Sequence, residues 1–182
     1  MAYAIRRARM GDEGIMAEMA GKLRLDPRNP RPEGFLTYPL DADGYHRRLI
    51  VSGNTYIAEN HHGSPAGFLM CFNELGLEVL AAYGDMDHQD GEVEFVMKQD
   101  KPFIFADQIG VLEPRNGAGR ALLGALFEDM EESHIPVMYA SVLKEPVENK
   151  ASFDFCREMG FEQMEAVRNP DGYLWVVHRK TV

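Results

Sequence analysis

Two glycines with one residue between them lie where a β-rich run gives way to a helical pattern. The run covers residues 103–111, and Gly117 and Gly119 lie in the loop that leads into the helix. Glycine lets a backbone approach a ligand closely, and the first amides of a helix have no acceptor within the helix. Those amides and the helix dipole favour a bound anion. The loop is therefore predicted to hold a phosphate or pyrophosphate group.

A second segment with chemically useful groups covers residues 149–161. Asn149 suits the N-cap of a helix, and Gly160 followed by Phe161 is typical of a C-terminal cap. Cys156 lies within this helix. A cysteine in a helix is often a small buried apolar residue, and an unperturbed thiol with a pKa of about 8.5 keeps its proton at neutral pH.

The rest of the chain must supply the elements that position these two segments. Apolar patterns predict strands at residues 3–9, 55–58, 67–72, 103–111, 136–143, 162–168 and 173–179. Helical spacing predicts helices that begin near Gly11, Asp41, Gly119 and Asn149. Residues 74–100 give no clear pattern, apart from an acidic turn at residues 84–91. Because no linker or repeat divides the chain, residues 1–182 are predicted to form one α+β domain.

The composition is that of a soluble globular domain, with 45% apolar and 26% charged residues. A net charge of −10 argues against nucleic-acid binding and fits either a cationic small molecule or simple solubility. Cys71 and Cys156 are too few for a disulfide framework. The N-terminal residues lack the apolar segment of a signal peptide, and no apolar run approaches the ~20 residues of a membrane span. A cytoplasmic location without membrane contact is expected.

Two motifs, in this order, resemble those of the GNAT N-acetyltransferase superfamily. Residues 111–123 resemble its pyrophosphate loop, (Arg/Gln)-x-x-Gly-x-(Gly/Ala), and the helix that follows. Residues 149–161 resemble its Asn-x-x-Ala-x-x-x-Tyr-x-x-x-Gly-Phe helix. The order of predicted elements agrees as well. The resemblance implies a mixed, mostly antiparallel central sheet of about seven strands, flanked by about four helices, with a splayed central strand pair.

Two positions depart from those motifs. Pro114 stands three residues before Gly117, where the superfamily has Arg or Gln, and Arg115 follows one place later. This departure leaves open which amides reach the pyrophosphate. Cys156 stands where the helix motif has tyrosine, which leaves open which group protonates the leaving thiolate.

The resemblance implies acetyl-CoA as co-substrate and no metal. Backbone amides at the start of the helix would hold the pyrophosphate, and two arginines would add charge-assisted bonds. These residues are Arg115, Asn116, Gly117, Ala118, Gly119 and Arg120. Backbone groups of Ile109, Val111 and Leu112 on the splayed strand would bind the pantetheine arm and the acetyl carbonyl. Asn149 resembles the asparagine that contacts the pantetheine, with a helix N-cap as its alternative role.

Asp107 is the candidate general base, directly or through water, because it lies on the central strand near a position where some superfamily members carry a carboxylate. Its alternative role is a solvated or salt-bridged aspartate. Cys156 is the corresponding candidate for the proton donor. Weaker candidates for the base are His134, His178 and Glu94, and Tyr139, Tyr173 or solvent could donate the proton instead.

The expected reaction is direct attack of a primary amine on the acetyl group. The acceptor groove would lie between residues 26–48 and residues 168–173, which carry Tyr38, Tyr45 and Asp171. A small-molecule amine is favoured over a peptide amine. A catalytically weak acyl-CoA-binding regulatory module and an unrelated α+β domain are the alternatives, and a homodimer is left open.

Two further clusters are expected to be solvated. His61 and His62 lie in a hairpin turn without a third metal ligand nearby. Residues 85–91 partly match a calcium loop, but the third carboxylate and the glycine are out of register.

Overall fold

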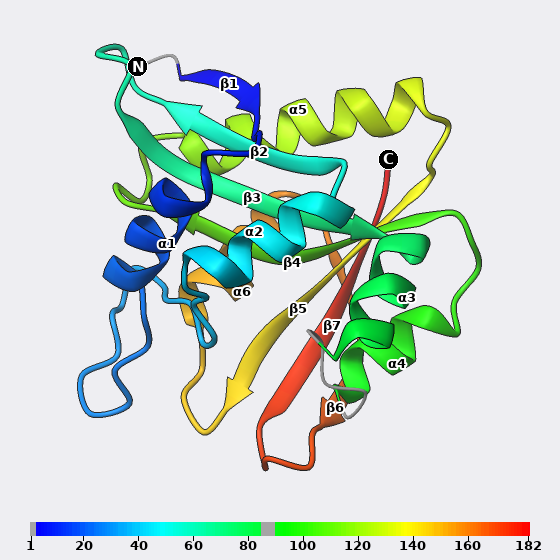
Figure 1. Ribbon diagram of the computed structural model, residues 1–182. Coiled ribbons are helices and arrows are strands. Elements are labelled where there is room, and N and C mark those ends of the chain that lie inside the picture. The colour runs from blue at the N-terminus through cyan, green and yellow to red at the C-terminus, as the bar shows by residue number, and fades with distance from the viewer. Residues whose placement is uncertain (1–2, 85–89) are drawn as a thin grey trace.

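The computed structural model describes residues 3–84 and 90–182, and a seven-stranded sheet lies at its centre in the order β1-β2-β3-β4-β5-β7-β6 (Figure 1). The strands are β1 (Ala4–Arg7), β2 (Asn54–Glu59), β3 (Pro65–Asn73), β4 (Phe103–Val111), β5 (Val137–Glu145), β6 (Glu162–Arg168) and β7 (Leu174–Thr181). Neighbouring strands are antiparallel, except for the parallel pair β4 and β5. The predicted sheet is confirmed.

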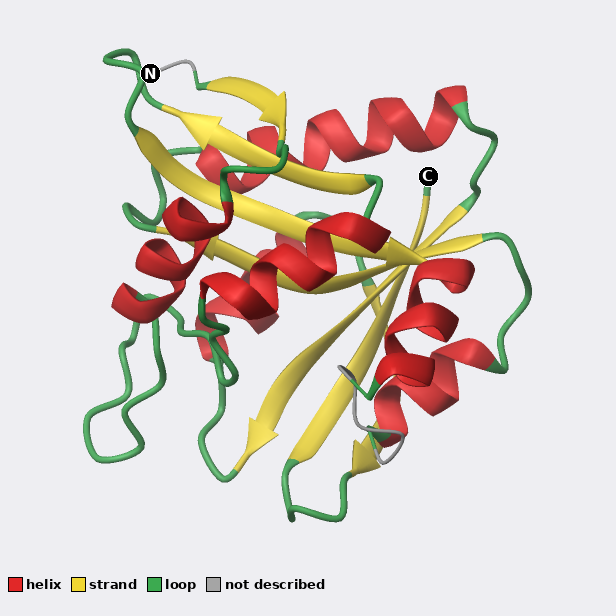
Figure 2. Cartoon of the chain, in the orientation of Figure 1, coloured by secondary structure: helices red, strands yellow, loops and turns green. Residues whose placement is uncertain are grey.

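Helices cover both faces of this sheet (Figure 2). They are α1 (Glu13–Lys22), α2 (Ala42–Val51), α3 (Glu74–Tyr83), α4 (Gly91–Met97), α5 (Ala118–Glu132) and α6 (Lys150–Glu158). Helices α1 to α4 bury Met16, Leu49, Leu77 and Val96 in one core. Helices α5 and α6 contribute to a second core on the opposite face, with Leu122 among its residues. A site at the centre of the sheet is therefore enclosed from both sides.

The described residues contain more helices than the four expected, because α3 and α4 occupy the segment whose pattern was unclear. Helix α3 begins directly after β3, and Asn73 caps it by accepting from the amide of Gly76 at 2.9 Å. Helix α4 is only seven residues long, too short to display a helical period clearly. The acidic turn and the partial calcium-loop match fall mainly on residues 85–89, outside the described residues.

The parallel strands β4 and β5 separate along their length. They pair from Phe103 opposite Val137 to Ala106 opposite Ala140. Beyond Ala106, β4 continues to Val111 with β3 as its partner. The second half of β4 therefore has a backbone edge that β5 does not cover, and the predicted splay is confirmed.

None of the helices in the described ranges is long and apolar enough to cross a membrane.

Candidate active site

Two adjoining cavities follow the opening between β4 and β5. One, of about 700 Å³, lies between the start of α5 and α6. The other, of about 380 Å³, lies in the opening itself and extends to α2 and α4. Phe35, Leu36, Ile109, Ser152 and Phe155 line both. The two cavities therefore form one cleft, whose larger part we call the cofactor cavity and whose smaller part we call the acceptor cavity, after the roles predicted from the sequence.

The N-terminus of α5 opens into the cofactor cavity without a side-chain cap. Gly117 is the N-cap residue, and the first backbone bond of the helix runs from the amide of Ala121 to the carbonyl of Gly117 at 3.0 Å. The amides of Ala118, Gly119 and Arg120 precede that bond and have no acceptor within the helix. All three residues line the cavity. This arrangement suits an anion.

The two glycines of the loop are required for different reasons. Gly117 has a φ of +90°, a conformation that a side chain disfavours. Gly119 has an ordinary φ, but a Cβ there would lie 3.2 Å from Cζ of Phe155 on α6. Gly119 therefore lets the Phe155 ring pack against the start of α5 between the two cavities.

The other predicted residues of the loop lie in different places. Arg115, with a φ of 65°, lines the cofactor cavity, and so does Arg120. The side chain of Asn116 instead donates to Glu113 at 3.0 Å, and Asn116 is not among the described residues lining the cavity.

The backbone of β4 corrects one prediction. The amide of Leu112 donates to the carbonyl of Ala66 at 2.9 Å, so it is not free to bind a pantetheine arm. Because backbone groups alternate in direction along a strand, the amides of Ile109 and Val111 face the opposite way, toward the uncovered edge. A contact between those two amides and the co-substrate remains a prediction.

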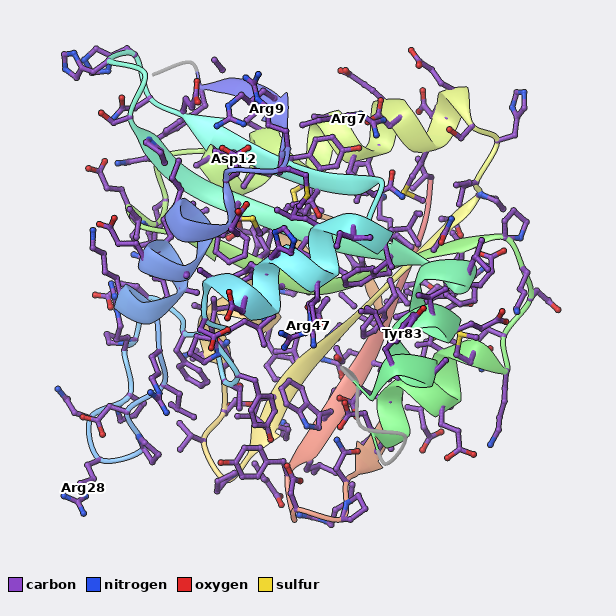
Figure 3. The ribbon with its side chains drawn as sticks, viewed as in Figure 1. Arg7, Arg9, Asp12, Arg28, Arg47 and Tyr83 are labelled. Carbon is purple, nitrogen blue, oxygen red and sulfur yellow. The ribbon has the colours of Figure 1, made fainter. Side chains whose placement is uncertain are left out.

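The loop between α1 and α2 closes one side of the cleft. Its two arms pair, because the amide of Leu25 donates to Leu36 at 2.9 Å and that of Leu36 donates to Leu23 at 2.8 Å. Arg28 lies at the tip, turned away from the sheet (Figure 3). The pairing holds Phe35 and Leu36 beside the cleft.

Asn149 joins this loop to α6. Its Oδ1 accepts from the amide of Ser152 at 3.3 Å, and its Nδ2 donates to the carbonyl of Phe35 at 3.0 Å. The loop approaches α6 closely at Gly34, where a Cβ would lie 3.4 Å from Cβ of Ala151. The N-cap role of Asn149 is therefore present, and a contact with pantetheine stays a prediction.

A β-bulge places two consecutive residues of β4 against the same helix. The register with β3 passes from Gln108 to Ala106 and skips Asp107, and such a bulge re-aims side chains. Asp107 accepts a hydrogen bond and forms an ion pair with Arg48 of α2. Gln108 accepts from the hydroxyl of Tyr45, also on α2, at 2.5 Å. Both partners come from a single helix.

These contacts bear on two of the predicted residues. Asp107 lines the acceptor cavity, but its carboxylate is already the partner of Arg48. Tyr45 is fully buried in the core and does not line the cavity. Its expected place in the acceptor groove is therefore wrong, because the hydroxyl turns to Gln108.

Glu92, which the sequence analysis missed, is the carboxylate with an unused atom. It lies in the first turn of α4, lines the acceptor cavity and is 7% exposed. Its Oε2 has no hydrogen-bond partner among the described residues. Burial raises the pKa of Glu92 to about 7, partly offset by hydrogen bonds to its own amide and Asn169. No residue pattern indicates that Glu92 is buried, because α4 lies in the segment whose apolar residues show no clear helical period.

Cys156 lies on α6 and lines the acceptor cavity. Burial raises the pKa of its thiol to about 12. A thiol with this pKa stays protonated but is a poor proton donor to the thiolate of an ordinary alkyl thiol, for which cysteine, with a pKa of about 8.5, is the reference. The burial and raised pKa of Cys156 therefore fit a small buried apolar residue better than a general acid.

The weaker candidates do not line the cleft. Glu94 is exposed and paired with Lys98 at 2.7 Å. His178 is buried, which lowers its pKa, and Nδ1 lies 3.0 Å from the carbonyl of Val176.

Tyr139 packs edge-on against Phe103 in the core. His134 follows α5 with a φ of 55°, and Tyr173 stacks on Tyr38. In the described ranges, no three His, Cys, Asp or Glu side chains form a metal-binding group.

Aromatic residues close the far end of the acceptor cavity. The hydroxyl of Tyr38 donates to Asp171 at 2.6 Å, which joins the α1–α2 loop to the β6–β7 turn. The Tyr38 ring lies 6.0 Å from that of Tyr173 and 6.2 Å from that of Trp175. Tyr38, Asp171 and Trp175 line the cavity, so the expected juxtaposition of these two segments is present.

Solved structures define the class to which this fold belongs. Ribosomal-protein-alanine N-acetyltransferase from Brucella melitensis is similar with a TM-score of 0.65 and 18% identity, over 98% of this chain and 99% of that one. For Ard1 from Thermoplasma volcanium the TM-score is 0.68 at 16% identity, over 100% and 99% of the two chains. For a polyamine N-acetyltransferase from Drosophila melanogaster it is 0.61 at 12% identity, over 100% of both.

The chain therefore has the fold of the GNAT N-acetyltransferases, as the sequence motifs indicated. Comparison of the sequence with protein-family models and with curated proteins finds no match. The likeness thus defines the fold, and the chemistry must be argued from the cleft.

Proposed function

We propose that this protein is an N-acetyltransferase that moves an acetyl group from acetyl-CoA to a primary amine. The observation that carries the proposal is the continuity of the cleft. An uncapped helix N-terminus, suited to a pyrophosphate, leads along the uncovered edge of β4 into a cavity with a buried carboxylate. A phosphate site, a strand edge for an amide-rich arm and a proton acceptor follow one another in the order that acetyl-CoA and an amine require.

The co-substrate would be held mainly by backbone. Amides of Gly117, Ala118, Gly119 and Arg120 would bind the pyrophosphate, with charge from Arg115 and the Arg120 side chain. The amides of Ile109 and Val111 would bind the pantetheine arm and polarise the acetyl carbonyl. Asn149 would stabilise this end indirectly, by holding the α1–α2 loop against α6.

In the reaction, Glu92 would accept a proton from the ammonium of the acceptor, directly or through one water. The neutral amine would then attack the thioester carbon, the C–S bond would break to release the CoA thiolate, and the amide nitrogen would lose its second proton to solvent. Asp107 was the base expected from the sequence. Its pair with Arg48 instead suits it to orient groups around the opening, and Glu92 replaces it in this proposal.

The leaving thiolate does not require protonation by the protein. Its conjugate acid is an alkyl thiol like that of cysteine, whose pKa is about 8.5, so the thiolate is an adequate leaving group and solvent can supply the proton afterwards. Cys156 would line the cavity without exchanging a proton. The acceptor could belong to a protein or to a small molecule, and the names of the similar enzymes include both kinds.

Direct measurement of CoA binding and of turnover tests the proposal. Calorimetry should detect CoA binding, and thiol release from acetyl-CoA should depend on an added amine. Gly119→Val should abolish binding, because its side chain would displace Phe155. Gly124→Val on the same helix is the matched control, since a Cβ at Gly124 has no neighbour within 4 Å.

Three outcomes are informative. Equal binding by both variants would contradict the placement of the pyrophosphate. Binding without turnover on any amine would favour an acyl-CoA-binding module, which Cys156 at the usual tyrosine position keeps under consideration. Absence of CoA binding by the unmodified protein would overturn the proposal.

A further inference from the structure

Two residues that line the acceptor cavity each have a buried polar atom without a hydrogen-bond partner among the described residues. The two atoms are Oε2 of Glu92 and Nε1 of Trp175. Buried polar groups are almost always hydrogen-bonded, and each exception requires an explanation. The proposed base role accounts for Glu92 and leaves the indole N–H of Trp175 unexplained.

The surroundings of Trp175 fix its ring. Trp175 is the second residue of β7 and lies opposite Leu143 of β5. Phe35 and Leu143 pack with it in a small core, and its exposed fraction is 9%. Such packing leaves the indole little freedom to turn toward solvent. Because Trp Nε1 can only donate a hydrogen bond, its missing partner is an acceptor atom rather than a cation.

The charges around the cavity restrict that acceptor atom further. Four carboxylates line the cavity, namely Asp90, Glu92, Asp107 and Asp171, whereas Arg48 is the one basic side chain among the described lining residues. Arg48 is already paired with Asp107. An anionic oxygen would be repelled here, so a neutral oxygen fits best.

We propose that the acceptor is a primary amine that also carries a neutral hydrogen-bond-accepting oxygen, and that Trp175 Nε1 recognises this oxygen while Glu92 receives the amino group. This inference rests on the proposed function. An amide carbonyl and an alcohol hydroxyl share the required chemistry. Before binding, a water can occupy the position of the oxygen, and the acceptor displaces it.

Four acceptors of similar size separate the possibilities: alaninamide, alaninol, sec-butylamine, which lacks oxygen, and alanine, which carries a carboxylate. We expect kcat/KM to be at least about tenfold higher for alaninamide or alaninol than for sec-butylamine, because an unpaired buried donor is costly. Alanine should be the poorest oxygen-bearing acceptor. The ranking of alaninamide against alaninol identifies the source of the oxygen.

Trp175→Phe tests the residue itself. This variant should lower kcat/KM for the preferred oxygen-bearing amine about tenfold or more, while changing that for sec-butylamine by less than about threefold. Equal losses for both amines would mean that Trp175 only supports the fold and would overturn the inference, as would a wild-type protein that does not distinguish the amines. No turnover with any amine would contradict the proposed function instead.

The fluorescence of the unmodified protein gives a readout without turnover, because Trp175 is the only tryptophan of the chain. With CoA present, alaninamide or alaninol should shift the indole emission as the water is replaced, and sec-butylamine should not. Identical responses to all amines would overturn the inference even if the Trp175→Phe variant failed to fold.

Discussion

Glu92→Gln should reduce catalysis and raise stability at the same time. Glutamine keeps the shape of the side chain but cannot accept the proton of the acceptor. General base catalysis contributes about 10²–10⁴-fold, so kcat/KM should fall by that factor. In the unmodified protein, kcat/KM should rise with pH through the pKa of Glu92, about 7, because the base is active when ionised. The variant should lose this dependence.

The stability change follows from the same pKa. Burial raises the pKa of Glu92 from 4.5 to about 7, so the folded protein holds this proton more tightly than the unfolded chain. The stabilisation is complete below pH 4.5 and is lost as the pH rises through about 7. At 1.36 kcal/mol for each tenfold change in the proton equilibrium, the loss is about 3 kcal/mol. Glutamine does not titrate, so the variant should gain up to this amount relative to wild type between pH 4.5 and 8.

Urea denaturation of both proteins at pH 5 and pH 8 measures the difference in the free energy of unfolding. The pH dependence of kcat/KM from pH 5.5 to 9 measures the change in catalysis. Glu94→Gln is the matched control, because Glu94 lies on the same helix but is exposed and paired with Lys98. It should leave the activity profile unchanged. A Glu92→Gln variant that keeps the pH dependence, or that is less stable than wild type at pH 8, would refute the reasoning. If Asp107→Asn alone removed the dependence, Asp107 would be the base.

Other changes test the remaining parts of the cleft. Cys156→Ser should keep at least about a tenth of kcat, because a thiol with a pKa of about 12 is a poor acid; a near-complete loss would restore its catalytic role. Asn149→Ala should lower the free energy of unfolding by about 1–2 kcal/mol through the lost cap and raise the KM for acetyl-CoA as the loop near Phe35 loosens. An unchanged KM would mean that this tie does not shape the cleft. Gly117→Ala should cost about 1–2 kcal/mol in urea denaturation, since φ is +90° there; a neutral result would show that the loop adopts another conformation.

The loop and the two helices that line the larger cavity could be predicted from the sequence because their information is local. Gly117 supplies a backbone conformation within its own segment, and Gly119 supplies space for Phe155, which belongs to the second motif. The helix motif likewise has its cap residue, Asn149, and its final Gly160 within one continuous run. Spacing within each segment was therefore enough to predict the loop and the helix, and the resemblance of the two motifs to those of a known superfamily predicted the fold that joins them.

The acceptor end could not be predicted in the same way. Glu92, Asp107 and Trp175 come from α4, β4 and β7, and their roles depend on burial and on partners from other segments. The bulge at Asp107 shows why, because a strict alternation would put Asp107 and Gln108 on opposite faces. Instead both reach α2, which removes Tyr45 from the groove and places Asp107 in an ion pair. Leu112 failed for a related reason, since its partner Ala66 lies on β3.

This division has a consequence for how the protein can be altered. In the proposed complex the co-substrate is held chiefly by backbone amides, which side-chain substitutions at the acceptor end do not change. Trp175 and Glu92 lie on the other side of the opening, on elements that contribute nothing to the start of α5. Substitutions there should therefore change which amine is used, or how fast it is acetylated. The dissociation constant for CoA should stay within about threefold of wild type, a change in binding free energy smaller than the 1.4 kcal/mol of a tenfold change. A Trp175→Phe protein that bound CoA tenfold more weakly would show that the two ends are energetically coupled.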